Sequence, residues 1–418
     1  MAPFNFEGDI QNINERQLEF INSAIEKLGY KNSKVTFNAV GTAGDNYAAN
    51  VKRITVEGEN GNLNIIAKIA PSSESLRENF HSALLFNNEI FVYSKVIPKF
   101  IQLQKQAAVP ADEQVKFPKC YGTFDEAPNE IILLEDIRVQ GYIMLDRFIP
   151  LTDYVVKGVL KSLATWHSLS YVLKNKEPET FNYFKDNLVD LWSILAEDKE
   201  NNESAVAFIT QVENMALGVL ADEPEYQNII KGKLISSVDR AAKLKKDENG
   251  NRFSVIQHGD TWTNNIMFKF QEDTLKESML IDYQIARNTS PVADLLYFFF
   301  NCTHHYARVE YFNEWLDYYH SQLDNSLSNY GLKANYVYPR DQLDADLKRY
   351  GKFALGNAIL TNSMINLKPE EATKVKAQMD SGDIANVDAV GSMDSASLLV
   401  YKRKLIGIAL SFEQFGLL

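Results

Sequence analysis

The stretch Val255–Phe270 constrains the fold of this chain more than any other. It reads VIQHGDTWTNNIMFKF and places one His, one Asp and two Asn within eight residues, between two apolar runs. On an α-helix, Asp260 and Asn265 would lie roughly 140° apart around the axis and could not converge. We therefore predict a loop that carries both side chains, followed by a strand over residues 266–270.

A second strand with a polar residue near its end follows this one. Residues 271–278 (QEDTLKES) are predicted as a turn region and residues 279–283 (MLIDY) as a strand. If the two strands pair antiparallel, their open ends bring Asn265 beside Asp282, with Asp260 on the loop that leads in. Amide and carboxylate oxygens suit an Mg²⁺ ion that also binds phosphate, and a carboxylate free of metal can accept a hydroxyl proton.

The pattern thus predicts three catalytic residues, Asp260, Asn265 and Asp282, of which Asn265 and Asp282 bind the metal. The alternative for an Asp beside a strand is an ordinary turn or cap residue. The combination of the three residues at these separations favours catalysis. His258 is predicted to hold the loop through backbone hydrogen bonds rather than to act as an acid or base.

Composition and charge narrow the class of protein. The chain has 418 residues, 45% of them hydrophobic and 23% charged, which is typical of a globular protein. A net charge of −12 disfavours nucleic acid as the main partner. The two cysteines, Cys120 and Cys302, lack metal-ligand spacing. The N-terminus has no signal-peptide pattern, and the longest apolar run, residues 295–300, is too short to span a membrane, so we expect a cytoplasmic protein.

The length and the change of pattern along the chain predict two units, residues 1–137 and 138–418. In the first unit we expect a helix within the first 30 residues, strands at 34–40, 48–56, 63–69 and 130–134, and a helix over 73–95. This is a small antiparallel sheet with one prominent helix. The second unit is predicted to be mainly helical, with one small β insert that holds the opening stretch.

HGDTWTNN followed by LIDYQ resembles the CHK kinase-like or ecdysteroid-kinase-like family, which is related to choline kinases and aminoglycoside phosphotransferases. The resemblance extends from about residue 30 to about residue 415. It implies an α+β, two-lobed protein-kinase-like fold, with a nucleotide-binding N-terminal lobe and a catalytic, substrate-binding C-terminal lobe. It further implies a small-molecule kinase that uses ATP and Mg²⁺.

The N-terminal unit carries candidate nucleotide ligands. Gly41 and Gly44 lie in a tight turn between two strands, where backbone N–H groups can bind phosphate, although most glycine turns are only turns. The family has a similar stretch, which Gly44, Asp45 and Asn46 match. The chain departs from it at Ala49, where the resemblance would place Ser.

Lys68 lies on the next strand among apolar residues and resembles the strand lysine that contacts the α and β phosphates in kinases. An ion pair with Glu89, on the following helix, would orient the lysine and keep it charged. The alternative is a solvent-facing lysine.

The strand at 130–134 resembles the connector between two kinase lobes. It implies that adenine binds to backbone near Leu134, Glu135 and Ile137, with Leu133 and Val40 as apolar walls. Glu135 can instead be simple surface charge. His167, in LATWHSLS, is expected to pack against the catalytic loop, and Asp294, in SPVADLLYF, to cap a helix or brace that loop.

Eleven residues separate Asp282 from Asp294, too few for the activation segment of a protein kinase, so we expect no protein substrate. The acceptor is predicted to be a small-molecule alcohol, and the resemblance implies an ecdysteroid or related steroid. Two alternatives stay open: a detoxification kinase with broad acceptors, and an inactive member that acts by binding a ligand.

Overall fold

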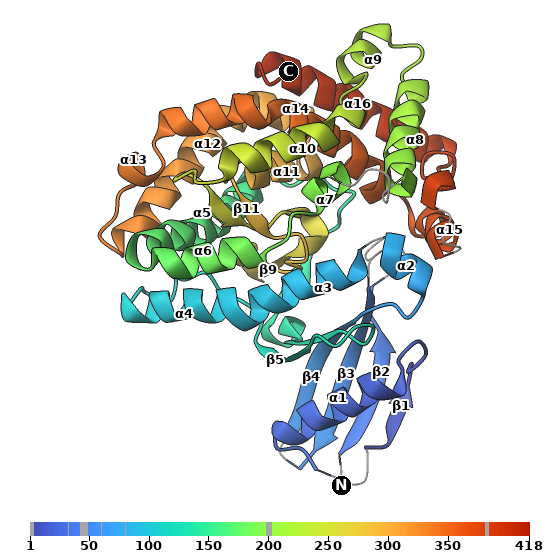
Figure 1. Cartoon of the computed structure of the whole chain (residues 1–418), viewed down its shortest axis with the longest axis vertical. Coiled ribbons are helices and arrows are strands. Elements are labelled where there is room, and N and C mark those ends of the chain that lie inside the picture. The colour runs from blue at the N-terminus through green and yellow to red at the C-terminus, as the bar shows by residue number, and fades with distance from the viewer. Residues whose placement is uncertain are drawn as a thin grey trace.

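The computed structural model describes residues 4–31, 33–41, 49–59, 61–79, 81–197, 203–380 and 384–418. In Figure 1 the blue N-terminal sheet forms one end of the molecule, and the helices of the second half form the larger end. The helices α3 and α4 run across the middle, between the sheet and the helical part. No helix in these described ranges is both long and apolar enough to cross a membrane.

The N-terminal part is built around a six-stranded sheet with the order β1-β2-β3-β4-β6-β5. All neighbouring strands pair antiparallel except β1 and β2, which are parallel and which the sequence did not predict as a pair. The strands are β1 (Phe6–Gly8), β2 (Lys34–Ala39), β3 (Asn50–Gly58), β4 (Gly61–Ile69), β5 (Cys120–Phe124) and β6 (Ile131–Glu135).

The predicted helix within the first 30 residues is α1 (Glu15–Lys27). Asn14 caps its start, because its side chain accepts from the Gln17 N–H while the Gln17 side chain accepts from the Asn14 N–H. Ile21 and Ile25 of α1 pack with buried strand residues in a core of the sheet's own. This burial holds α1 on one face of the sheet.

The helix predicted over 73–95 is instead a series of helical segments that reaches residue 106. It consists of α2 (Glu74–Asn79), α3 (Ser82–Phe91), a π-helical turn (Val92–Val96) and α4 (Ile97–Gln106). Buried apolar residues continue beyond Lys95, among them Phe100 and Leu103, and this explains why the helix continues. Pro98, at the start of α4, has no N–H for the preceding turn.

The C-terminal part is mainly helical, as predicted. Helix α5 packs along α12, and α11 packs along α14. One large apolar core joins these helices to residues of α3 and α4. The helices are α5 (Asp153–Lys176), α6 (Pro178–Asn187), α7 (Leu191–Glu197), α8 (Glu203–Val219), α9 (Pro224–Ile230), α10 (Ile235–Glu248), α11 (Val292–Cys302), α12 (His305–Ser328), α13 (Ala334–Val337), α14 (Arg340–Ile365), α15 (Pro369–Asp380) and α16 (Ser395–Gln414).

Two small sheets lie within this part. The first has the order β10-β9-β7, and the second pairs β11 with β8. The predicted turn region 271–278 is wrong, because residues 274–278 belong to a strand and the turn is formed by Glu272 and Asp273. Charged side chains on the exposed face of that strand hid its alternation. The strands are β7 (Tyr142–Met144), β8 (Val255–Gln257), β9 (Ile266–Gln271), β10 (Thr274–Leu280) and β11 (Arg287–Thr289).

The α+β fold class is confirmed: a small N-terminal sheet is joined to a large helical part. The division into residues 1–137 and 138–418 stays a prediction. The last residue of β6 is Glu135, while β7 pairs with β9 in the helical part.

Candidate active site

The β9–β10 hairpin places Asn265 and Asp282 at its open end. Ile266 pairs with Leu280 at the end of the ladder, and Ile281 N–H donates to the Asn265 carbonyl at 3.0 Å. Asp282 follows with a φ of 66°, in the left-handed region that few residues other than glycine adopt. Such a conformation carries a strain cost and is enriched at functional sites.

Asp260 and Asn265, which were predicted to converge on a loop, contact each other directly. The Asn265 amide Nδ2 donates to Asp260 Oδ2 at 2.8 Å and to the Asp260 carbonyl at 2.9 Å. Tyr297, on α11, donates its hydroxyl to Asp260 Oδ1 at 2.6 Å. Tyr297 was missed by the sequence analysis, because it lies in an apolar run that reads as core. Both carboxylate oxygens of Asp260 are therefore held in position.

The loop that carries Asp260 is held by Asp294. The two carboxylate oxygens of Asp294 accept from the backbone N–H groups of His258 and Gly259, each at 2.8 Å. His167 Nε2 lies 3.0 Å from Asp294 Oδ2, so His167 reaches the loop through Asp294. Burial by itself raises the pKa of Asp294, but the bond to His167 and the bond from the Gly259 N–H lower it below its ordinary value.

His258 crosses the site and links the loop to the hairpin. Its Nε2 lies 2.8 Å from the Ile281 carbonyl, and its Nδ1 accepts from the Asp260 N–H at 3.2 Å. Burial lowers the pKa of His258, which favours the neutral ring that these two bonds require. These contacts agree with a positioning role for His258.

Gly259 is a further position that the sequence analysis did not single out. Its φ is 94°, and a Cβ there would lie 2.4 Å from the Ile285 carbonyl oxygen. The signal was available in the sequence, since a Gly between His and Asp in a tight loop commonly marks a backbone that other residues cannot adopt.

Lys68 joins the two parts of the chain. Its Nζ lies 2.5 Å from Glu89 Oε2 on α3 and 2.7 Å from Asp282 Oδ1 after β10. Burial alone would lower the pKa of Lys68, but the carboxylates of Asp282 and Glu89 together raise it. Burial raises the pKa of Glu89 to about 7, although Lys68 acts in the opposite direction. The lysine therefore stays charged beside two acidic groups.

A cavity of about 240 Å³ brings most of the predicted site residues together. Its lining comes from the sheet, from α3, from the segment after β6 and from the hairpin. The predicted residues that line it are Gly41, Lys68, Glu89, Leu134, Glu135, Ile137, Asn265 and Asp282. Asp260 does not line it but is bonded to Asn265, which does.

The predicted apolar walls of the adenine site, Leu133 and Val40, lie in different places. Leu133 does not line the cavity, because neighbouring strand residues face opposite ways and Leu133 packs into the core under α1. Val40 does line it, as predicted. Gly44, Asp45 and Asn46 lie outside the described residues, so their predicted contacts with phosphate stay predictions.

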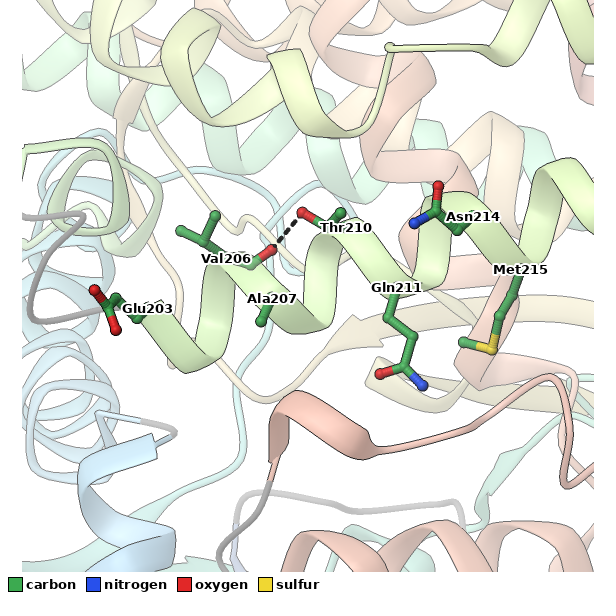
Figure 2. A pocket seen from close by; sticks show the side chains of 7 residues that line it. All are labelled: Glu203, Val206, Ala207, Thr210, Gln211, Asn214 and Met215. Carbon is green, nitrogen blue, oxygen red and sulfur yellow. Dashed lines mark hydrogen bonds between the residues drawn. The ribbon is translucent and has the colours of Figure 1, made fainter.

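A second hollow, of about 640 Å³, runs along α8 and is shown in Figure 2. Its described lining comes from α8 alone, between Glu203 and Met215, and includes none of the predicted site residues. Converging polar groups from several elements are what a catalytic site requires. The smaller cavity has them and the hollow along α8 does not.

The acidity of Asp260 follows from its surroundings. Burial, and then the nearby charge of Asp282, raise the pKa of Asp260 to about 6. The hydrogen bonds from Tyr297 and Asn265 and the charge of Lys68 act in the opposite direction. A carboxylate with this pKa is mostly ionised at neutral pH and is more basic than an ordinary Asp, which suits a proton acceptor.

The residues present fit an Mg²⁺ ion that is shared with a nucleotide. The described residues contain no cluster of three or more His, Cys, Asp or Glu side chains that would hold a metal alone. Mg²⁺ in phosphate-binding sites commonly takes only one or two protein oxygens and completes its shell with phosphate and water. Asp282 offers a carboxylate, and Asn265 offers its Oδ1, since its Nδ2 is engaged by Asp260.

A sheet lysine paired with a helix glutamate, facing an Asp–Asn loop and a strand-end Asp, defines a class: the kinases of protein-kinase-like fold. The sequence profile of the ecdysteroid kinase-like family matches residues 43–332, well over half of the chain. The chain belongs to this family. It is a small-molecule kinase, that is, a phosphotransferase with an alcohol group as acceptor.

Three solved structures resemble the whole chain at low identity. A Plasmodium vivax ethanolamine kinase has 12% identity and a TM-score of 0.42, over 96% of this chain and 90% of that chain. The GDP complex of wild-type aminoglycoside 2'-phosphotransferase-IIIa has 10% identity and a TM-score of 0.41, over 95% of this chain and 99% of that chain. Spectinomycin phosphotransferase in complex with ADP and spectinomycin has 14% identity and a TM-score of 0.40, over 91% of this chain and 99% of that chain. No curated protein sequence matches the chain.

Proposed function

We propose that this kinase transfers the γ-phosphoryl group of ATP to a hydroxyl group of an apolar alcohol, an ecdysteroid or a related steroid. The observation that carries the proposal is the contact of Lys68 with both Glu89 and Asp282 beside the Asp260–Asn265 pair. In this arrangement one cation and two potential metal ligands face a single cavity. The family to which the chain belongs supports the steroid class of acceptor.

Each side chain has a proposed role in the transfer. Asp260 orients the acceptor hydroxyl and takes its proton, while the acceptor oxygen forms a bond to the γ-phosphorus and the bond to the ADP oxygen breaks. Asn265 and Asp282 would hold Mg²⁺, which would neutralise phosphate charge when bound. Lys68 would leave its contact with Asp282 to bind phosphate and would stay paired with Glu89. No covalent enzyme intermediate is needed.

Adenine is proposed to bind beside β6. The backbone N–H groups of Glu135 and Asp136 already donate to the carbonyls of Lys119 and Asn64, at 2.8 and 3.2 Å. Ile137 is therefore the residue whose backbone we assign to the adenine contact. Apolar side chains line the cavity on both sides of this position: Val40, Val51, Ile66, Leu134, Met144, Met267 and Ile281.

The apolar acceptor is supported by exposed apolar side chains on β7 and shortly after it. Met144, on β7, lines the nucleotide cavity and is 37% exposed. Phe148 and Ile149, which follow in the chain, are 43% and 64% exposed. Neighbouring exposed apolar residues of this kind mark surfaces that bind apolar partners. We propose that the body of the acceptor lies on this segment.

The test is an ADP-release assay with a panel of hydroxyl acceptors: an ecdysteroid, a sterol, a short primary alcohol and an amino alcohol. The phosphate ester is identified by mass spectrometry, and Asp260→Asn serves as the inactive control. We expect ester formation with the steroids only. Turnover of all the acceptors would favour a broad detoxification kinase, and steroid binding without ester formation would favour an inactive ligand-binding protein. Either result would contradict the proposal.

The predicted cytoplasmic location stays a prediction.

A further inference from the structure

A cavity of about 420 Å³ lies at the C-terminal end of α11, away from the nucleotide cavity. Its lining comes from the end of α11, the start of α12, α14, α16 and the loop before α5. The two cavities share no described lining residue. The new cavity touches the catalytic loop through Cys302, whose Sγ lies 3.6 Å from Thr263 Oγ1 and 3.8 Å from the Thr261 carbonyl oxygen.

The lining of this cavity is cationic, although the chain carries a net charge of −12. Arg308 comes from α12, Arg403 and Lys404 from α16, and Arg147 from the loop before α5. His304 and His305 also line the cavity. The described lining residues include no Asp or Glu. Clefts lined by charges of one sign concentrate ligands of the opposite sign.

Arg308 is buried without an ionic partner among the residues that the structure describes. It is 2% exposed and donates to the Thr303 carbonyl at 2.6 Å, the Gly407 carbonyl at 3.0 Å and Ser411 Oγ at 3.0 Å. All these acceptors are neutral. Buried arginines are normally paired with a carboxylate, because an uncompensated buried charge is costly. Burial lowers the pKa of Arg308 to about 9.

Lys404 adds a second charge without a partner. Within the described ranges, its ammonium group makes no hydrogen bond or ion pair, although most of the side chain is covered. Burial lowers the pKa of Lys404 to about 8, with Cys302 acting against this effect and the charge of Arg308 adding to it. Arg308 and Lys404 line the same cavity, and an anion bound there would offset their like charges.

The rest of the lining has a polar part, with Asn301, Thr303 and Asn362, and an apolar part. Phe300 stacks against the Arg308 guanidinium, with 4.8 Å from Cζ to the ring centroid, and Ile406, Ile408 and Leu410 also line the cavity. A volume of about 420 Å³ lies within the range of small-molecule sites. A small inorganic ion would leave most of this volume and the apolar walls without contacts.

We propose that this cavity binds an amphipathic organic anion, with its carboxylate, sulfate or phosphate group between Arg308 and Lys404 and its apolar body against Phe300 and α16. The site is separate from the nucleotide cavity and does not depend on phosphoryl transfer. It therefore adds a further ligand to the nucleotide and the acceptor that the kinase reaction requires.

The test uses three probes with the same chain: octyl sulfate, octanol and octyltrimethylammonium, with inorganic sulfate as a fourth. Binding to the full chain is measured by isothermal titration calorimetry below micellar concentrations and without nucleotide. We expect octyl sulfate to bind at least about tenfold more tightly than the other three probes, as a charge-assisted contact in a covered site provides. Equal affinity for octanol would overturn the anion site, and equal affinity for inorganic sulfate would overturn the amphipathic ligand.

Lys404→Met and Lys402→Met form a matched pair of variants on α16. Lys402 is paired with Asp222 at 2.6 Å and does not line the cavity. We expect Lys404→Met to weaken octyl sulfate binding about tenfold and Lys402→Met to leave it unchanged. Lys404→Met should not lower the thermal midpoint, because Lys404 has no described partner to lose and its like charge beside Arg308 is removed.

Two further results would overturn the proposal. The first is displacement of octyl sulfate by Mg·ATP, because it would place the probe in the nucleotide cavity. The second is an unchanged affinity in Lys404→Met. Neither result would affect the proposed kinase reaction, which is read from ester formation.

Discussion

Lys68 Nζ lies 2.7 Å from Asp282 Oδ1, although the two residues are 214 positions apart in the chain. Both residues line the nucleotide cavity, and their contact joins the proposed phosphate ligand to the proposed metal ligand. The proposed reaction requires Mg·ATP to come between them, and this requirement sets the first prediction.

Mg·ATP should stabilise the wild-type chain, and Asp282→Ala should remove most of that effect. A ligand at about 100 times its Kd stabilises the folded state by about 2.7 kcal/mol. Without the Asp282 carboxylate, the metal keeps only Asn265 as a protein ligand. The measurement is the thermal midpoint with and without Mg·ATP, and with ATP plus a chelator as control. A full shift in Asp282→Ala would rule out Asp282 as the metal ligand.

Asp260→Asn should lower kcat by a factor on the order of 10²–10⁴ while the Kd for ATP stays the same. The amide cannot accept the proton of the hydroxyl group, and Asp260 does not line the nucleotide cavity. Steady-state kinetics and calorimetry measure the two quantities. Asp273→Asn, at the exposed turn of the same hairpin, is the matched control and should behave as wild type. Near-normal turnover of Asp260→Asn would contradict the assignment of the base.

The rate should fall as the pH is lowered through the pKa of Asp260, which is about 6, because only the ionised carboxylate accepts a proton. The hydrogen bond from Tyr297 favours the ionised form. Tyr297→Phe should therefore raise the apparent pKa and move the acid limb of the kcat/KM profile to higher pH. A loss of rate in Tyr297→Phe with an unchanged pH profile would instead indicate a structural role alone.

Asp294→Ala should destabilise the fold by about 3–5 kcal/mol, because it leaves buried backbone N–H groups and His167 without their acceptor. Denaturant unfolding measures this change. Asp222→Ala removes an exposed partner of Lys402 and should leave the midpoint unchanged. If the two variants had the same midpoint, Asp294 would not be the residue that holds the loop.

Local spacing was enough to find most of the candidate site. The apolar neighbours of Lys68 identified it as a directed lysine, and the five-residue separation of Asp260 and Asn265 required a loop. It was not enough for Leu133, because every residue of that strand segment is apolar. The sequence therefore does not show which residues face the cavity and which face the core under α1. Nor did it identify the hydrogen bond from Tyr297 to Asp260, because an aromatic run reads as core.

The sequence by itself determined which residues are candidates for the chemistry and that a loop and a hairpin present them, because these features follow from the rotation and alternation of a short piece of chain. Only the tertiary structure decided which distant side chains complete them. The Lys68–Asp282 contact, the support of the loop by Asp294 and the cationic cavity between α11 and α16 all join segments whose relative positions depend on packing of the whole core. The periodicity of a short segment does not predict how distant segments pack together.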